Sequence, residues 1–90
     1  MTWRLLLMPG AEQKLNKIPD HDATRIKDEL RALANEPYPR LYAKKLKGHP
    51  NSPLYSFRVG QYRIILVFEG NVMIITVIDI GNRSNVYRKY

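Results

Sequence analysis

The sequence predicts an α+β domain with an N-terminal strand, an antiparallel helix hairpin and three antiparallel strands in one small, mostly antiparallel sheet. Three observations predict it. Two segments of the first half repeat apolar residues at helical spacing, the last third is rich in β-branched residues, and glycine turns separate its apolar runs. Helices followed by strands are typical of a helical layer on a sheet. The 90 residues fit one domain, 1–90.

The N-terminal segment Trp3–Met8 is expected to be a strand, and Gly10–Ile18 a short helix that Pro9 introduces. The apolar run of the strand ends at Pro9 and is too short for a secretory signal or a membrane span. We therefore expect a cytoplasmic protein that does not contact membranes.

A second helix follows the turn at Pro19–Asp22 and is expected to end near Asn35. Asp20 or Asp22 is expected to cap it by accepting hydrogen bonds from its first N–H groups. Five residues form its apolar stripe: Ala23, Ile26, Leu30, Leu33 and Ala34. Since the connecting turn is short, the two helices should form an antiparallel hairpin.

The segment Arg40–Pro53 shows no clean periodicity and is expected to be a loop with glycine and prolines. Its apolar residues are expected to anchor it: Leu41, Tyr42 and Leu46. Its lysines are expected to point outward and bind RNA: Lys44, Lys45 and Lys47.

Three strands are expected at Leu54–Val59, Tyr62–Glu69 and Val72–Ile80, joined by tight turns at Gly60-Gln61 and Gly70-Asn71. A two-residue first turn places Arg58 directly opposite Arg63 on one face. Like charges at such positions repel, so the pair fits a face that receives an anion. The helices are expected to cover the other face, which carries Phe57, Ile64, Leu66 and Phe68.

The positive charge is concentrated in the second half of the chain. Residues 1–39 hold six basic and six acidic side chains, and residues 40–90 hold nine and two, which accounts for the net charge of +7. Such an asymmetry is typical of a surface that meets a polyanion.

Several site types have no support in the sequence. There is no cysteine, and His21 and His49 are too few for a typical zinc cage. The glycines form no phosphate-binding loop, and neither histidine has a nearby nucleophile in sequence. We expect no metal and no cofactor. Asp79 is expected to pair with a nearby arginine.

Arginine, lysine and tyrosine remain as candidate functional groups. Arginine forks can stabilise the charge that develops when a 2′-hydroxyl attacks its neighbouring phosphate. Tyrosine is a poor base at neutral pH unless cations lower its pKa. A site built from these residues should therefore need another molecule that orients the RNA. The same residues could also form a binding surface without chemistry.

The stretches Leu54–Ile65 and Ile80–Tyr87 resemble the RelE/ParE superfamily of toxin–antitoxin toxins. They carry the patterns LYxxRxGxYRI and RxxVY, preceded by Lys45-Leu46-Lys47-Gly48. The resemblance implies the RelE-like fold of a small sheet with a helix hairpin. For the RelE branch it implies a toxin that enters the ribosomal A site, promotes messenger RNA cleavage there and is restrained by a cognate acidic antitoxin in a heterodimer or heterotetramer.

The resemblance also assigns roles to single residues. Arg63 matches the arginine expected at the scissile phosphate, Arg83 the one that stabilises the transition state, and Tyr87 the tyrosine linked to stacking or proton transfer. Arg58 falls where the family has a basic residue. Ser56 departs from the family, which has a lysine there, and Lys45 or Lys47 could compensate. The remaining cations of the tail are expected to bind RNA: Arg88 and Lys89.

Three functions stay open from the sequence. The first is a ribosome-dependent endoribonuclease toxin. The second is a poison of DNA gyrase, as in the ParE branch. The third is a non-catalytic RNA- or protein-binding domain of the same fold, including a degenerate toxin.

Overall fold

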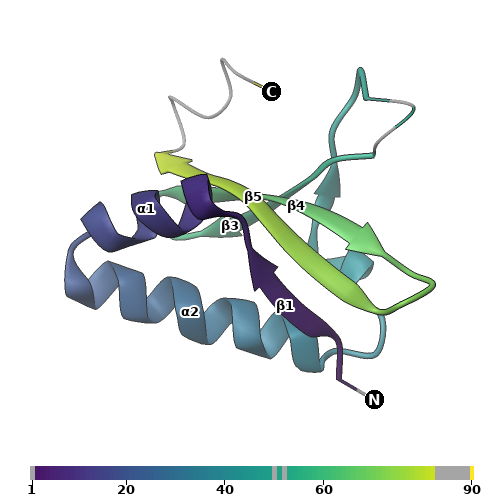
Figure 1. Ribbon diagram of the computed structural model, residues 1–90, viewed down its shortest axis with the longest axis horizontal. Helices are drawn as coiled ribbons and strands as arrows, with labels where there is room; N and C mark the ends of the chain where they lie inside the picture. Colours follow the sequence, from purple (N-terminus) through teal and green to yellow (C-terminus); the bar gives the residue numbers. More distant parts are fainter. Residues whose placement is uncertain (1, 50, 52, 83–89) are drawn as a thin grey trace.

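The computed structural model describes residues 2–49, 51, 53–82 and 90. Within these residues a five-stranded sheet has the order β1-β5-β4-β3-β2, and α2 runs along one side of it (Figure 1). The elements in chain order are β1 Arg4–Leu7, α1 Pro9–Lys17, α2 Asp20–Asn35, the 3-10 helix η1 Pro39–Tyr42, β2 Lys44–Lys45, β3 Tyr55–Val59, β4 Tyr62–Glu69 and β5 Ile74–Asn82. The predicted α+β class is confirmed.

The sheet is antiparallel except at one edge. The strands β2 to β5 pair antiparallel in sequence order, whereas β1 pairs with β5 in parallel, with Arg4 opposite Ile74. The two helices cross from β1 to the far part of the sheet and run in opposite directions (Figure 1). A parallel pair needs such a crossover, because a tight turn can join only antiparallel strands.

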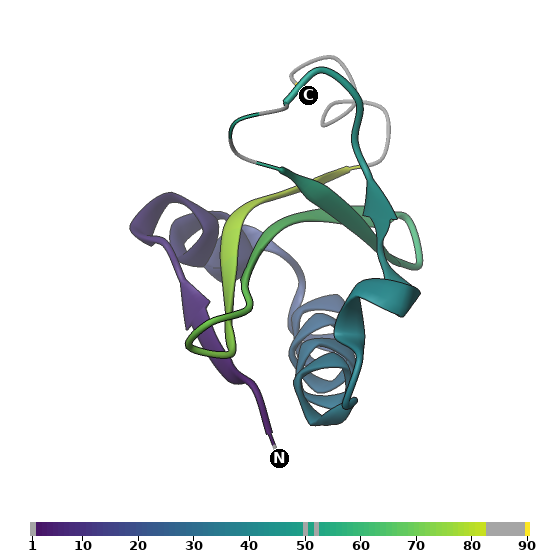
Figure 2. The same cartoon turned by 90° about the vertical axis from the view of Figure 1, so that its right-hand side faces the viewer.

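The main core lies between the helices and one face of the sheet, on the side of α2 in Figure 2. Ile26 and Leu30 of α2 are at most 1% exposed and belong to the same cluster as Phe57, Ile64 and Leu66 of the sheet. The predicted stripe of α2 and the predicted covered face are therefore confirmed.

Trp3 closes this core near the N-terminus. Its ring meets Phe68 edge-on, with centroids 6.0 Å apart, and its backbone N–H donates to the Ala34 carbonyl at the end of α2. The Arg40 guanidinium lies over both rings, 5.7 and 5.4 Å from their centroids. These contacts join the residue before β1 to α2, η1 and β4 around one aromatic pair.

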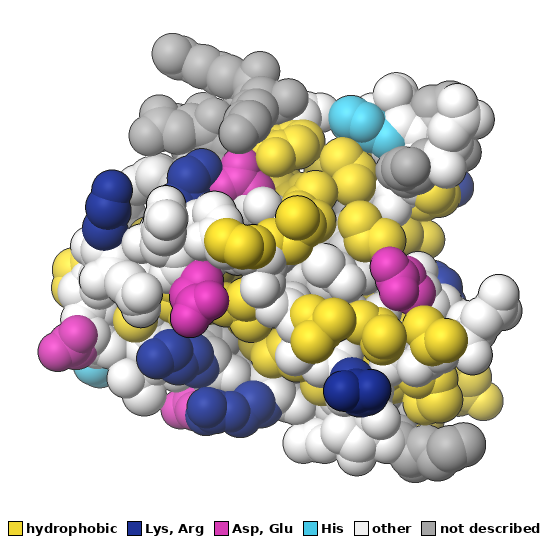
Figure 3. All heavy atoms as spheres, viewed as in Figure 1, with side chains coloured by type: hydrophobic (Ala, Val, Ile, Leu, Met, Phe, Trp, Pro, Cys, Tyr) yellow, Lys and Arg dark blue, Asp and Glu magenta, His cyan; other side chains and the backbone are white. Residues whose placement is uncertain are grey.

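The opposite face of the sheet carries a second, smaller apolar cluster. Leu54 and Ile65 are buried there, and four half-exposed side chains pack against them: Leu46, Val67, Ile78 and Tyr90. Figure 3 shows hydrophobic side chains gathered over β4 and β5 on this side. The central strands thus carry apolar side chains on both faces, and among the described residues helices cover one face only.

A bulge in β5 shapes this second face. Ile65 lies opposite Asp79 and Leu66 opposite Val77, so Ile78 is an extra residue in the ladder. The bulge directs Asp79 to the face opposite the helices, where Tyr90 and Ile65 also lie.

Several expected boundaries were wrong. The segment predicted as a loop contains η1 and the two-residue strand β2, and its predicted anchors Leu41 and Tyr42 are 78% and 58% exposed. Only Leu46 packs against the sheet. A two-residue strand has no periodicity to detect, and its place at the edge is set by pairing with β3.

The last turn and the helix cap also differ from expectation. The turn after β4 spans residues 70–73, with Met73 at φ 53°, so β5 begins and ends two residues later than predicted. Neither Asp20 nor Asp22 caps α2. Both lie in its first turn, where their negative charges interact favourably with the helix dipole. The predicted entry of α1 through Pro9 is confirmed.

Candidate functional site

The β3–β4 hairpin places two arginines side by side, as predicted. Its turn is Gly60-Gln61, with Gly60 at φ 57°, a conformation that glycine adopts without strain. Val59 pairs with Tyr62 and Arg58 with Arg63. Both arginines are on the face opposite the helices, because their neighbours Val59 and Ile64 belong to the main core.

The two guanidinium groups diverge along the strands. Arg63 is buried, 9% exposed, and its Nη1 donates to the Ser56 hydroxyl at 3.1 Å. Arg58 is exposed and its Nε donates to the Gly60 carbonyl at 3.3 Å. Because Ser56 and Gly60 flank Arg58 on opposite sides in sequence, the two charges point apart, which lowers their repulsion.

Ser56 thus contacts the arginine to which the family resemblance gives a central role. It is 4% exposed and pairs with Ile65 in the β3–β4 ladder. The sequence singled Ser56 out only as a departure from the family pattern. Its contact with Arg63 depends on the direction that the Arg63 side chain takes across the sheet, and the spacing of residues in the sequence does not reveal that direction.

The three predicted lysines lie at different places. Lys44 is opposite Ser56 in the β2–β3 ladder and therefore shares its face, whereas Lys45 is opposite Tyr55 on the other face. Lys45 and Lys47 line a shallow hollow with Leu46, and all three lysines are exposed. Lys44 is thus the lysine beside the arginine pair, while the sequence named Lys45 or Lys47 as the substitute.

Four predicted residues lie outside the described residues: Arg83, Tyr87, Arg88 and Lys89. The described part of β5 reaches the site, since Gly81 pairs with Arg63 and Asn82 with Tyr62. Arg83 follows directly in the sequence.

Arg25 is a further cation near this hairpin that the sequence did not indicate. A Cβ atom added at Gly60 would lie 3.0 Å from its Nη1, so the Arg25 side chain reaches the turn from α2. Beside it, the Tyr62 hydroxyl donates to Asp22 at 3.0 Å. Burial, and then the hydrogen bond and charge of Asp22, raise the pKa of Tyr62 above 10.0, which excludes it as a base at neutral pH.

Asp79 is a structural carboxylate beside α1. Lys14 Nζ donates to its Oδ1 at 2.5 Å, the Ile80 N–H at 2.9 Å, and the Tyr90 hydroxyl to its Oδ2 at 3.1 Å. Burial acts to raise the pKa of Asp79, but these three donors outweigh it and lower that pKa below 3.8. The expected partner was an arginine, and the observed one is Lys14.

Tyr90, like Tyr62, has a raised pKa. Burial, followed by the charge and hydrogen bond of Asp79, shifts its pKa above 10.0. Like Tyr62, it is therefore a hydrogen-bond donor and no base at neutral pH.

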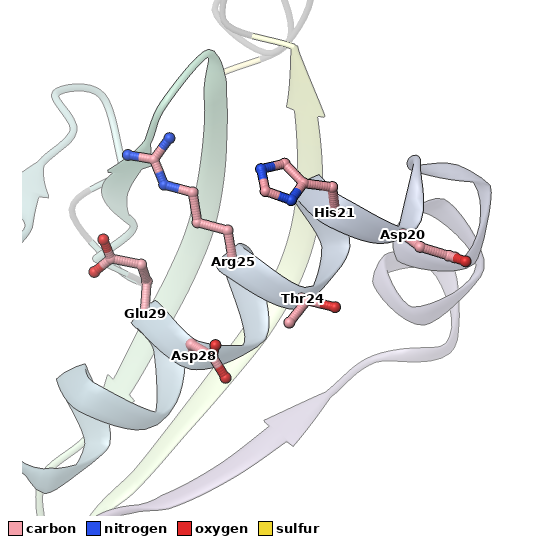
Figure 4. A pocket seen from close by; sticks show the side chains of 6 residues that line it. All are labelled: Asp20, His21, Thr24, Arg25, Asp28 and Glu29. Atoms are coloured by element: carbon pink, nitrogen blue, oxygen red, sulfur yellow. The ribbon is translucent and has the colours of Figure 1, made fainter.

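A broad hollow on the outer side of α2 is no candidate for a catalytic centre. Six residues line it: Asp20, His21, Thr24, Arg25, Asp28 and Glu29. Figure 4 shows that their side chains project in different directions, and the charges are of both signs. In the described residues no three His, Asp or Glu side chains gather as metal ligands. None of the helices described is long and apolar enough to cross a membrane.

The family comparison adds the identity. The model for the ParE toxin of the type II toxin–antitoxin system parDE matches residues 5–87. The chain belongs to this toxin family. It is therefore a toxin of a type II toxin–antitoxin system, within the RelE/ParE superfamily. The comparison with curated proteins gave no match.

Solved structures show the same fold for the toxin. A chain of the archaeal RelE–RelB complex from Pyrococcus horikoshii is 27% identical, with a TM-score of 0.75 over 92% of this chain and 97% of that chain. A chain of the Mycobacterium tuberculosis RelBE2 complex has a TM-score of 0.81 at 18% identity, covering 93% and 94%. The isolated E. coli RelE toxin has 0.72 at 22%, covering 97% and 93%.

The toxin's described site is thus an arginine pair with one buried and one exposed member. Lys44 and Arg25 add cations near it from β2 and α2. The described residues thus bring cations from β2, β3, β4 and α2 to the β3–β4 hairpin.

Proposed function

We propose that the toxin is a metal-independent, ribosome-dependent endoribonuclease that cuts messenger RNA in the A site and so inhibits translation. The observation that carries the proposal is the Arg58–Arg63 pair. One guanidinium is buried and held by Ser56, while the other is exposed to an incoming chain. A fixed cation beside an accessible one can receive a phosphate and then stabilise its extra charge.

The proposed reaction is an in-line attack by the 2′-hydroxyl of the RNA. Its oxygen bonds to the adjacent phosphorus, and the bond from phosphorus to the 5′-oxygen breaks. The 2′-hydroxyl loses a proton and the leaving oxygen gains one, giving a cyclic phosphate and a 5′-hydroxyl end. Arg63 and Arg83 stabilise the phosphorane charge, Arg58 contacts the phosphate, and Tyr87 stacks on a base or transfers a proton.

The dependence on the ribosome follows from the weakness of the base. Tyr62 and Tyr90 have raised pKa values and hold carboxylates, so neither removes the 2′-hydroxyl proton at neutral pH. The ribosome aligns the RNA for in-line attack, which reduces the demand on the catalyst. The outer cations hold the RNA backbone in this proposal: Lys44, Lys45, Lys47, Arg88 and Lys89.

We further propose that a cognate acidic antitoxin binds the toxin. Several of the similar structures are complexes of RelE with RelB. The net charge of +7 and the half-exposed apolar side chains on the face of the arginine pair suit an acidic segment that folds on binding. Covering the Arg58–Arg63 face would stop RNA entry.

A gyrase poison is the second candidate, because the matching family model is that of ParE. The two candidates predict different targets. A ribosome-dependent nuclease arrests translation and leaves gyrase-catalysed supercoiling unchanged, whereas a gyrase poison does the reverse.

The deciding experiment measures cleavage of messenger RNA on programmed ribosomes with an occupied P site. Wild type is compared with Arg63→Ala and Arg83→Ala, and with Arg31→Ala as a control on the exposed side of α2, where Arg31 contacts Asp28. A-site cuts that both site variants lose and the control keeps support the proposal. No cleavage together with gyrase inhibition supports the second candidate, and neither activity leaves a binding domain.

A further inference from the structure

The contact between Ser56 and Arg63 joins two buried polar groups on neighbouring strands. Ser56 is 4% exposed and Arg63 9%, and 3.1 Å separates the hydroxyl oxygen from Nη1. Ser56 pairs with Ile65, and Arg63 lies two residues before Ile65 on β4. The long side chain of Arg63 therefore lies along the sheet surface toward β3.

This course needs a small residue at position 56. A buried site leaves no room for a longer side chain beside the Arg63 guanidinium. Arg58 is directly opposite Arg63, and the two like charges repel each other. The Ser56 hydroxyl accepts a hydrogen bond from Arg63 on the side away from the Arg58 guanidinium.

A hydroxyl differs from a carboxylate as a partner for arginine. A carboxylate holds a guanidinium but cancels its charge, whereas a hydroxyl holds it and leaves the positive charge for a phosphate. Arginine presents five N–H donors in a fixed fork, and the hydrogen bond to Ser56 is made by Nη1.

We propose that Ser56 is a positioning residue that holds the Arg63 guanidinium at the scissile phosphate. The inference rests on the proposed function and adds to it the residue that sets the geometry of Arg63. Ser56 itself does not touch the RNA. In this proposal Ser56 is part of the site, and its presence in place of the family's lysine does not indicate that the site is inactive.

The test compares Ser56→Ala, which removes the acceptor, with Ser56→Thr, which keeps the hydroxyl. Thr24→Ala is the matched control, since it removes an exposed hydroxyl on the outer side of α2. On programmed ribosomes we expect Ser56→Ala to lower kcat about ten-fold with KM changed less than about two-fold. Ser56→Thr should restore most of kcat. Equal kcat for Ser56→Ala and wild type, or equal losses for alanine and threonine in folded protein, would overturn the proposal.

A second measurement separates this inference from the proposed function. The Arg63 side-chain N–H signals are followed by NMR in the free protein and assigned with Arg63→Lys. We expect slow proton exchange in wild type and Ser56→Thr, and faster exchange in Ser56→Ala. If wild type cuts no RNA, the proposed function fails and these signals still decide whether Ser56 holds Arg63. Unchanged exchange in Ser56→Ala refutes the inference.

Discussion

Lys44 lies directly opposite Ser56 across the β2–β3 ladder, and Lys45 lies opposite Tyr55. Two adjacent lysines of one short strand therefore face opposite sides of the sheet. Lys44 shares the face of the arginine pair, which makes the two lysines a matched pair for testing where RNA runs.

We predict that Lys44→Ala weakens RNA cleavage more than Lys45→Ala. Lys44→Ala removes a phosphate contact on the face of the arginine pair and should lower kcat/KM on ribosomes about ten-fold. Lys45→Ala should change kcat/KM less than about three-fold. Both variants keep the same net charge, so a general electrostatic effect would lower them equally. Equal losses would contradict a directed role of Lys44.

The two arginines should fail in different ways. Arg63 is buried and fixed, so Arg63→Ala should lower kcat by about 100-fold or more. Arg58 is exposed, so Arg58→Ala should chiefly raise KM and reduce the salt dependence of binding. Steady-state kinetics at two salt concentrations measure both. A KM effect alone for Arg63→Ala would argue against its role in the transition state.

Asp79 should make the free energy of unfolding depend on pH in the acidic range. Its pKa is lower in the folded chain than the ordinary 3.8, so its ionised form favours folding. That contribution is complete above the unfolded pKa and is lost as pH falls through the folded value. Asp79→Asn should cost about 1–3 kcal/mol in urea unfolding at pH 7, and its difference from wild type should shrink below pH 3.8.

The control for this prediction is Asp28→Asn. The Asp28 side chain is 66% exposed and 3.4 Å from Arg31, and exposed pairs contribute little. A loss as large as that of Asp79→Asn would show that the effect does not come from the buried cluster.

Alanine at two glycines should act in opposite directions. Gly60 has φ 57°, and a Cβ there would lie 3.0 Å from Arg25 Nη1, so Gly60→Ala should destabilise by about 1–2 kcal/mol. Gly10 is in α1 with nothing within 4 Å of an added Cβ, so Gly10→Ala should stabilise by up to about 1 kcal/mol. Urea unfolding followed by circular dichroism measures both.

The register of the hairpin could be predicted because a two-residue turn leaves one pairing. Arg58 opposite Arg63 followed from the position of Gly60 alone. The covered face followed from alternation along β3 and from the stripe of α2, since each side chain's direction is fixed by its element.

Contacts that depend on rotamers or on distant parts of the chain could not be predicted. Lys14 and Asp79 are 65 residues apart in sequence, and no local pattern joins them. The contact of Arg63 with Ser56 depends on the direction of the Arg63 side chain, which the sequence pattern does not determine. Strand β2 exists because β3 offers it an edge, and its two residues carry no signal. The roles of Arg83 and Tyr87 stay predictions.

Trp3 is the chain's one tryptophan, buried at 7% exposure against Phe68. Its indole emission therefore reports the integrity of the helix-side core. The arginine pair is on the other face of the sheet, so substitutions there leave the indole surroundings unchanged. A variant of Ser56, Arg58 or Arg63 with an unaltered emission spectrum keeps the core around Trp3 intact, so any loss of activity does not come from unfolding of that core. Tryptophan emission can thus serve as a folding control in each experiment on the face that carries the arginine pair.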